Sequence, residues 1–171
     1  PRDMKYQEWQ AWQDAGCPDV AEWRKANAPK VETKAPRLAD SFTAAKTQAE
    51  ADGFLKSMGL ESEYERKNIH VDIANTVNQE IAKYKDKFGD KISLRGIKLW
   101  PKRDANFAAA YSPAFGDVYL HRVKAKDTLK MWAKDAANEF GLGTWSTGSK
   151  EHIIRHELGH AVHKGVGKQT N

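Results

Sequence analysis

The sequence His156-Glu157-Leu158-Gly159-His160, near the C-terminal end of the chain, has the pattern H-E-x-x-H. On an α-helix, positions four residues apart lie on one face, so the two imidazoles can converge on a single ion. Neutral imidazole is a preferred ligand of Zn²⁺. Glu157 projects about 100° further round the helix, where its carboxylate can take a proton from a metal-bound water. The pattern therefore predicts that His156 and His160 bind Zn²⁺ and that Glu157 is the catalytic general base.

The residues around this motif predict the helix that it requires. Ser149 is a suitable N-cap, and Gly165 and Gly167 can end the helix. The apolar positions of the same helix are Ile153, Ile154, Leu158, Ala161 and Val162. The alternative interpretation is an amphipathic helix whose histidines are solvated.

The composition limits the classes of protein to which the chain can belong. Its 171 residues are enough for one domain with a hydrophobic core. The formal charge is +5, but the basic residues are interspersed with acids and form no block, which argues against nucleic-acid binding. No apolar run is long enough to span a membrane, and no signal-peptide pattern opens the chain.

Cys17 is the only cysteine, so an intrachain disulfide is impossible. This fits a reducing compartment. It also means that zinc would be held by histidine and carboxylate side chains.

The first part of the chain, residues 1–40, predicts a helical arm followed by a linker. Tyr6, Trp9 and Trp12 recur at threefold spacing in a first short helix, and Pro18-Asp19 opens a second. Residues 28–39 contain two prolines and several basic residues, which favours an extended linker. The domain that carries the motif is then expected at residues 41–171. Because the chain begins with proline and stops soon after the motif, we expect this domain to be truncated at its C-terminus.

Three further segments have the apolar period of a helix. Ser41 is the expected N-cap of a helix that runs to about Ser57. Asp72 is expected to cap a long helix that ends at Phe88, and Asp127 to cap one that ends near residue 140. The apolar stripe of the long helix is Ile73, Val77, Ile81, Tyr84 and Phe88.

Between the last two of these helices the pattern changes to that of strands. Residues 92–100 predict a strand interrupted near Gly96, and residues 107–111 and 118–121 predict a hairpin. The expected fold class is therefore α+β, with several helices packed on a small mixed sheet and an active-site helix near the C-terminus.

This order of elements, with H-E-L-G-H at its end, resembles the zincin-like metallopeptidase fold over residues 68–164. The resemblance implies a peptide or protein substrate that lies extended beside one of the strands next to the site, at 107–111 or 117–121. The physical basis is pairing of the peptide backbone with an open sheet edge.

A second resemblance rests on short matches: Tyr6-Gln7-Glu8-Trp9, residues 45–51, Met58-Gly59-Leu60 and residues 74–78. They are similar to the C-terminal part of bacteriophage minor head proteins of the Mu F-like group. The resemblance implies a phage or prophage component that is made in the bacterial cytoplasm during assembly and is then part of the virion, with capsid or portal proteins as partners.

A third zinc ligand is needed, because zinc hydrolases use three protein ligands and leave one position open for water. In the metzincin pattern, the glycine position would be His163 and the last ligand position would be Val166, so that pattern does not fit. Three sources remain open. The third ligand could lie beyond Asn171, which we favour; it could be His163; or it could be His152 or His121.

The sequence thus predicts a zinc-dependent peptidase domain of a phage head protein, with neither its substrate nor its oxyanion-stabilising residue assigned. One alternative is a zincin-like structural or interaction module of the virion with weak or no catalysis. The tryptophans of the arm support it, because exposed aromatic side chains favour protein contacts. Another alternative is a toxin-like effector domain that acts on a host protein.

Overall fold

The structure is a computed structural model that describes residues 4–27, 36–102, 107–122, 124–126, 129–143 and 146–167. The chain divides into two compact units, Pro1–Ala35 and Pro36–Asn171.

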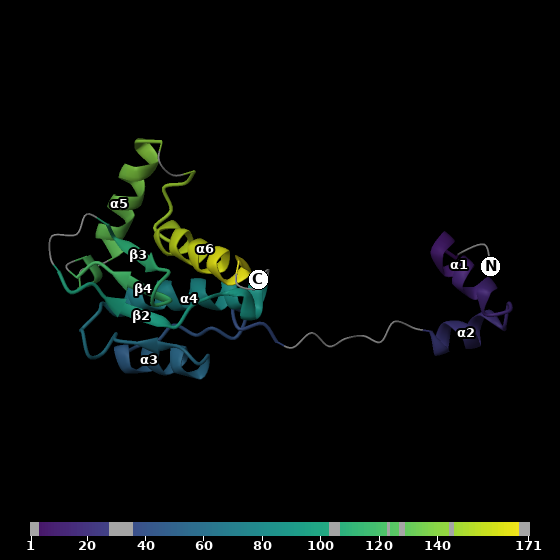
Figure 1. The fold of residues 1–171 in the computed structure, drawn as a ribbon. Coiled ribbons are helices and arrows are strands. Elements are labelled where there is room, and N and C mark those ends of the chain that lie inside the picture. The colour runs from purple at the N-terminus through teal and green to yellow at the C-terminus, as the bar shows by residue number, and fades with distance from the viewer. Residues whose placement is uncertain are drawn as a thin grey trace. The chain divides into compact units, whose positions relative to one another are not determined.

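The N-terminal unit contains the two short helices that the sequence predicts, α1 (Tyr6–Asp14) and α2 (Val20–Ala26) (Figure 1). Asp19 caps α2 by accepting hydrogen bonds from two backbone N–H groups of its first turn. An ion pair between Arg24 and Glu8, with an N–O distance of 2.7 Å, joins the helices. Neither helix has a buried residue, so polar contacts rather than a core hold this unit together.

The main unit is an α+β fold, as predicted: helices pack on a small mixed sheet (Figure 1). Within the described residues the strand order is β1-β2-β4-β3, with β1, β2 and β4 parallel and β3 antiparallel to β4. The elements are α3 (Gln48–Ser57), β1 (Glu61–Ser62), α4 (Val71–Phe88), η1 (Gly89–Lys91), β2 (Gly96–Leu99), β3 (Ala109–Ser112), β4 (Asp117–Leu120), η2 (Lys124–Lys126), α5 (Leu129–Gly141) and α6 (His152–Gly167).

The predicted hairpin is confirmed by β3 and β4, which pair from Ala109 opposite Leu120 to Ser112 opposite Asp117. Gly116 makes its turn with a φ of 72°, a conformation that costs glycine little. The predicted strand over residues 92–100 is shorter, because only Gly96–Leu99 joins the sheet. Before it, the backbone N–H of Ser93 donates to the carbonyl of Ala161 in α6 at 3.0 Å, which keeps this segment out of the sheet.

The prediction that Ser41 caps the third helix is wrong. Helix α3 begins at Gln48, and the side chain of Thr47 caps it by accepting a hydrogen bond from the backbone N–H of Glu50. The Ser41 hydroxyl instead donates to the carbonyl of Leu38 at 3.0 Å. The physical reason is tertiary: the segment before α3 is held in a non-helical path along α4.

Two side chains of α4 hold that path. The Asp86 carboxylate accepts the backbone N–H groups of Leu38 and Ala39 at 2.8 Å each. The Asn75 amide bonds both the N–H and the carbonyl of Ala45. The main unit begins at Pro36, whereas the sequence predicts that this domain begins at residue 41.

Helix α4 is the centre of the core, as its apolar stripe predicts, since Ile73, Val77 and Ile81 are wholly buried. The prediction that Asp72 caps this helix is wrong, because the N-cap lies two residues earlier. The ring of His70 accepts the backbone N–H of Asp72 at 3.2 Å and is the N-cap, so Asp72 lies in the first turn.

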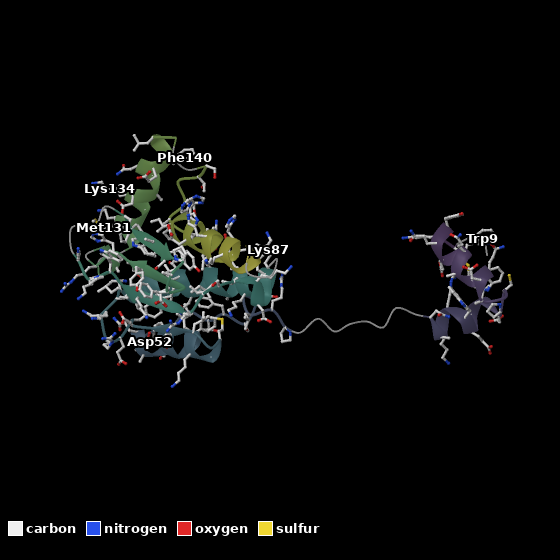
Figure 2. The ribbon with its side chains drawn as sticks, in the orientation of Figure 1. Trp9, Asp52, Lys87, Met131, Lys134 and Phe140 are labelled. Carbon is white, nitrogen blue, oxygen red and sulfur yellow. The ribbon has the colours of Figure 1, made fainter. Side chains whose placement is uncertain are left out.

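Helix α5 covers most of the segment predicted for it, although its expected cap, Asp127, lies outside the described residues. Trp132 and Ala136 are buried, whereas Phe140 at the end of the helix is 54% exposed (Figure 2).

One face of the sheet belongs to the hydrophobic core. Because side chains alternate along a strand, Ile97 of β2 and Val118 and Leu120 of β4 share this face, and Lys98 and Tyr119 lie on the other. The core cluster joins the first face to Ile73 and Ile81 of α4 and to Ile154 and Leu158 of α6. In the parts of the chain that the structure describes, no helix has both the length and the apolar character needed to cross a membrane.

Candidate metal centre

The motif lies on α6, whose exposed face carries both histidines. The Nε2 atoms of His156 and His160 are 3.2 Å apart, and their rings are nearly perpendicular with centroids 4.8 Å apart. Two ligands that are each about 2.0–2.1 Å from a tetrahedral zinc ion lie about 3.3 Å from one another. The spacing of the two nitrogens therefore fits a shared zinc ion. The buried face of the helix is formed by Ile153, Ile154, Glu157, Leu158, Ala161 and Gly165.

Glu157 faces the sheet rather than solvent and is 9% exposed. Its Oε2 atom accepts the backbone N–H of Tyr111 at 2.6 Å, and Tyr111 belongs to β3, the outermost strand on that side of the described sheet. Burial raises the pKa of Glu157, while the Tyr111 N–H and the charges of His156 and His160 act in the opposite direction. The carboxylate thus lies within the electrostatic influence of both imidazoles and is held by the strand.

His152 continues the row of histidines one turn before His156, with their ring centroids 6.3 Å apart. Burial lowers the pKa of His152, and the neighbouring His156 and Arg155 lower it further. The lowered pKa favours the neutral imidazole of His152, which is the form of histidine that binds metals.

A surface hollow of about 460 Å³ borders this row. His156 and His160 both line it, and Glu157 does not. The lining residues are Tyr84, His152, Arg155, His156, Gly159 and His160.

The other candidates for a third ligand are not brought to the pair. His163 is exposed on the following turn of α6. His121 is 5% exposed at the end of β4, where its ring packs edge-on against Phe107 with centroids 6.3 Å apart. Over the described ranges, no group of three or more His, Cys, Asp or Glu side chains is arranged to hold a metal ion. Of the predicted ligands, the structure thus brings His156 and His160 together and does not add His163 or His121 to them.

An ion pair between the buried Glu80 and the partly exposed Arg155, which the sequence did not predict, positions α6 against α4. Both carboxylate oxygens of Glu80 accept from the guanidinium of Arg155, at 2.7 and 3.1 Å, and Lys83 donates to Glu80 at 2.7 Å. The hydroxyl of Tyr84 also donates to the carbonyl of Arg155 at 3.1 Å. Glu80 lies three residues after Val77 on the core face of α4. A charged residue at such an apolar position could have indicated a buried ion pair.

The pH dependence of stability should reveal this pair. Burial alone would raise the pKa of Glu80, but its hydrogen bonds from Arg155 and Lys83 outweigh burial and lower it. Because the pKa of Glu80 is lower in the folded state, the ion pair stabilises the fold fully above the pKa of the unfolded chain, about 4.3. This stabilisation is lost as the pH falls through the pKa of the folded state. We expect Glu80→Gln to reduce the free energy of unfolding by about 2 kcal/mol at pH 7 and by much less at pH 3.

Urea unfolding of both proteins at pH 7, 5, 4 and 3 measures this difference. Glu65→Gln is the control, because Glu65 is exposed and its change should leave the pH profile of the wild type intact. A constant difference between Glu80→Gln and wild type at every pH would contradict a stabilising charge on Glu80.

Comparisons of the chain with models of known protein families, with curated proteins and with solved structures gave no match.

Proposed function

We propose that this chain is a zinc-dependent peptidase domain in which His156 and His160 bind the metal and Glu157 is the general base. The observation that supports it best is the 3.2 Å separation of the two Nε2 atoms beside an open hollow. When bound, zinc lowers the pKa of a coordinated water to about 7. A buried carboxylate with a raised pKa is suited to take a proton near neutral pH and to pass it to the leaving amine.

The strand next to α6 supports a peptide as substrate. Within the described sheet, β3 pairs only with β4, so no strand pairs with its other edge. An extended peptide can add to such an edge through backbone hydrogen bonds, with the Tyr111 N–H, which already donates to Glu157, left out of the pairing. Glu157, bonded to the Tyr111 N–H of this strand, would then lie beside the bound peptide.

The proposed setting is a phage or prophage head protein, made in the bacterial cytoplasm and then carried in the virion. A second candidate function, an interaction module that contacts capsid or portal proteins, is favoured by the exposed aromatic side chains of α1. Tyr6 and Trp9 are 71% and 37% exposed, and their ring centroids are 6.2 Å apart. A toxin-like effector would share the chemistry of the peptidase but act on a host protein.

Zinc binding tests the metal site directly. We expect purified protein to bind one equivalent of zinc, removable by a chelator, and the double variant His156→Ala/His160→Ala to bind none. Both side chains are exposed, so the variant should keep its fold, which circular dichroism checks. His163→Ala is the control, because it removes an exposed histidine of the same helix. Equal zinc content in the double variant and the control would overturn the proposed site.

A further inference from the structure

A second pocket lies away from the histidine row, on the face of the sheet opposite the core. Its volume is about 400 Å³. Two aromatic and four cationic side chains contribute to its wall, and we call it the cationic-aromatic pocket. These side chains are Trp100, Tyr119, Lys67, Lys98, Arg122 and Lys126.

The aromatic rings of the pocket are fixed by the sheet. Tyr119 is on β4, opposite Lys98 of β2. Trp100 directly follows β2 and donates its backbone N–H to the carbonyl of Leu120 at 2.8 Å. The rings of Trp100 and Tyr119 are perpendicular, at 89° with centroids 5.3 Å apart, and Phe107 contacts the Trp100 ring from another direction. A perpendicular corner of this kind offers a ring face on which a flat ligand can stack.

The pocket lining carries a net positive charge. Four cations and one carboxylate, Glu63, contribute to its lining. Glu63 is already engaged, since it pairs with Arg66 and accepts the backbone N–H of Leu99 at 3.2 Å. Within the described ranges, Lys67 and Lys126 make no ion pair, so their charges are available to an anionic ligand.

The other two cations are held in place by neighbours. Lys98 pairs with the buried Asp117 at 2.9 Å, and Arg122 donates to the carbonyl of Pro101 at 3.1 Å. The four cations come from the segment before α4, from β2, from the residues after β4 and from η2. They form no block in the sequence, and only the fold gathers them.

We propose that the cationic-aromatic pocket binds single-stranded nucleic acid. A base stacks on the corner formed by Trp100 and Tyr119, and Lys67, Arg122 and Lys126 contact the phosphates. Aromatic platforms with a basic surround are the usual means of binding single strands without sequence preference. An acidic peptide could use the cations but would leave the aromatic corner without a flat partner. A duplex keeps its bases stacked on one another and could use only the charges.

Fluorescence anisotropy of a labelled twelve-nucleotide oligothymidylate with the full chain tests the charges. We expect Lys67→Glu/Lys126→Glu to weaken binding at least tenfold. Loss of two phosphate contacts should also make the plot of log affinity against log salt less steep, reducing the magnitude of its negative slope by about 1.4. The matched control is Lys87→Glu/Lys91→Glu, which makes the same charge change at exposed lysines at the C-terminal end of α4 and in η1 (Figure 2). Equal binding by the two double variants would overturn the proposal.

The aromatic corner is tested separately with Trp100→Leu and Tyr119→Leu, each checked for folding by thermal unfolding. Each is expected to weaken oligothymidylate binding about tenfold while leaving the salt slope intact, because stacking carries no charge. Two results would overturn a nucleic-acid site: unchanged affinity in both folded variants, or equal competition by duplex DNA or by oligoglutamate of the same charge. Glu157→Gln should bind the oligonucleotide as the wild type does, so this test is independent of the peptidase.

Discussion

Glu157→Gln is expected to keep zinc and to lose peptide hydrolysis by about 10²- to 10⁴-fold in kcat/KM. The amide has the shape of the carboxylate, and its oxygen can still accept the Tyr111 N–H that holds Glu157 at 2.6 Å. It has no basic oxygen with which to take a proton from water. The change therefore removes the proposed proton transfer while leaving the imidazole pair and the packing of α6 in place.

The measurement is cleavage of a mixed peptide library by wild type and variant, each with its zinc content determined. Glu151→Gln is the matched control, because Glu151 lies just before α6 and is paired with Lys150 at 2.8 Å rather than with the histidines. We expect it to cleave at the wild-type rate. Full activity in Glu157→Gln would end the general-base mechanism, and a wild type that binds zinc but cleaves nothing would favour the interaction module.

Gly165→Ala is expected to destabilise the main unit by about 3 kcal/mol or more. A Cβ atom at this position would lie 1.8 Å from the carbonyl oxygen of Lys91 and 2.6 Å from its carbonyl carbon. Both are backbone atoms, so relief requires α6 and η1 to move apart. That movement would also disturb the nearby hydrogen bond from Ser93 to Ala161 in α6.

Gly159→Ala is the matched control on the same helix. A Cβ atom there would meet nothing within 4 Å, and the position is exposed. Because alanine is the better helix former, we expect this change to stabilise the protein by about 0.5–1 kcal/mol. Chemical unfolding of the two variants should therefore give shifts of opposite sign. A Gly165→Ala variant as stable as the wild type would show that α6 does not contact η1 as described.

The parts of the fold that the sequence predicts are those decided by local pattern. The apolar stripe of α4 and the turn at Gly116 follow from periodicity and turn chemistry. The four-residue spacing of His156 and His160 on one helix accounts for their close approach.

The parts that escaped prediction depend on contacts between distant segments. Ser41 is a good cap in isolation, but the bonds of Asp86 to Leu38 and Ala39 set the chain on another path. The pair of Glu80 and Arg155 joins residues 75 positions apart. The hydrogen bond from Tyr111 to Glu157 likewise depends on how β3 meets α6. The periodicity of apolar residues does not indicate which distant segments come into contact.

Helix α6 is held near both ends. Arg155 donates to Glu80 of α4, and Gly165 packs closely against Lys91 of η1. The turn that carries His156 and His160 lies between these two anchors. Its backbone amides should therefore exchange with deuterium only when the whole unit opens, although the imidazoles themselves face water. The pair would then behave as a rigid, preorganised chelate whose affinity for an ion is not reduced by local fraying.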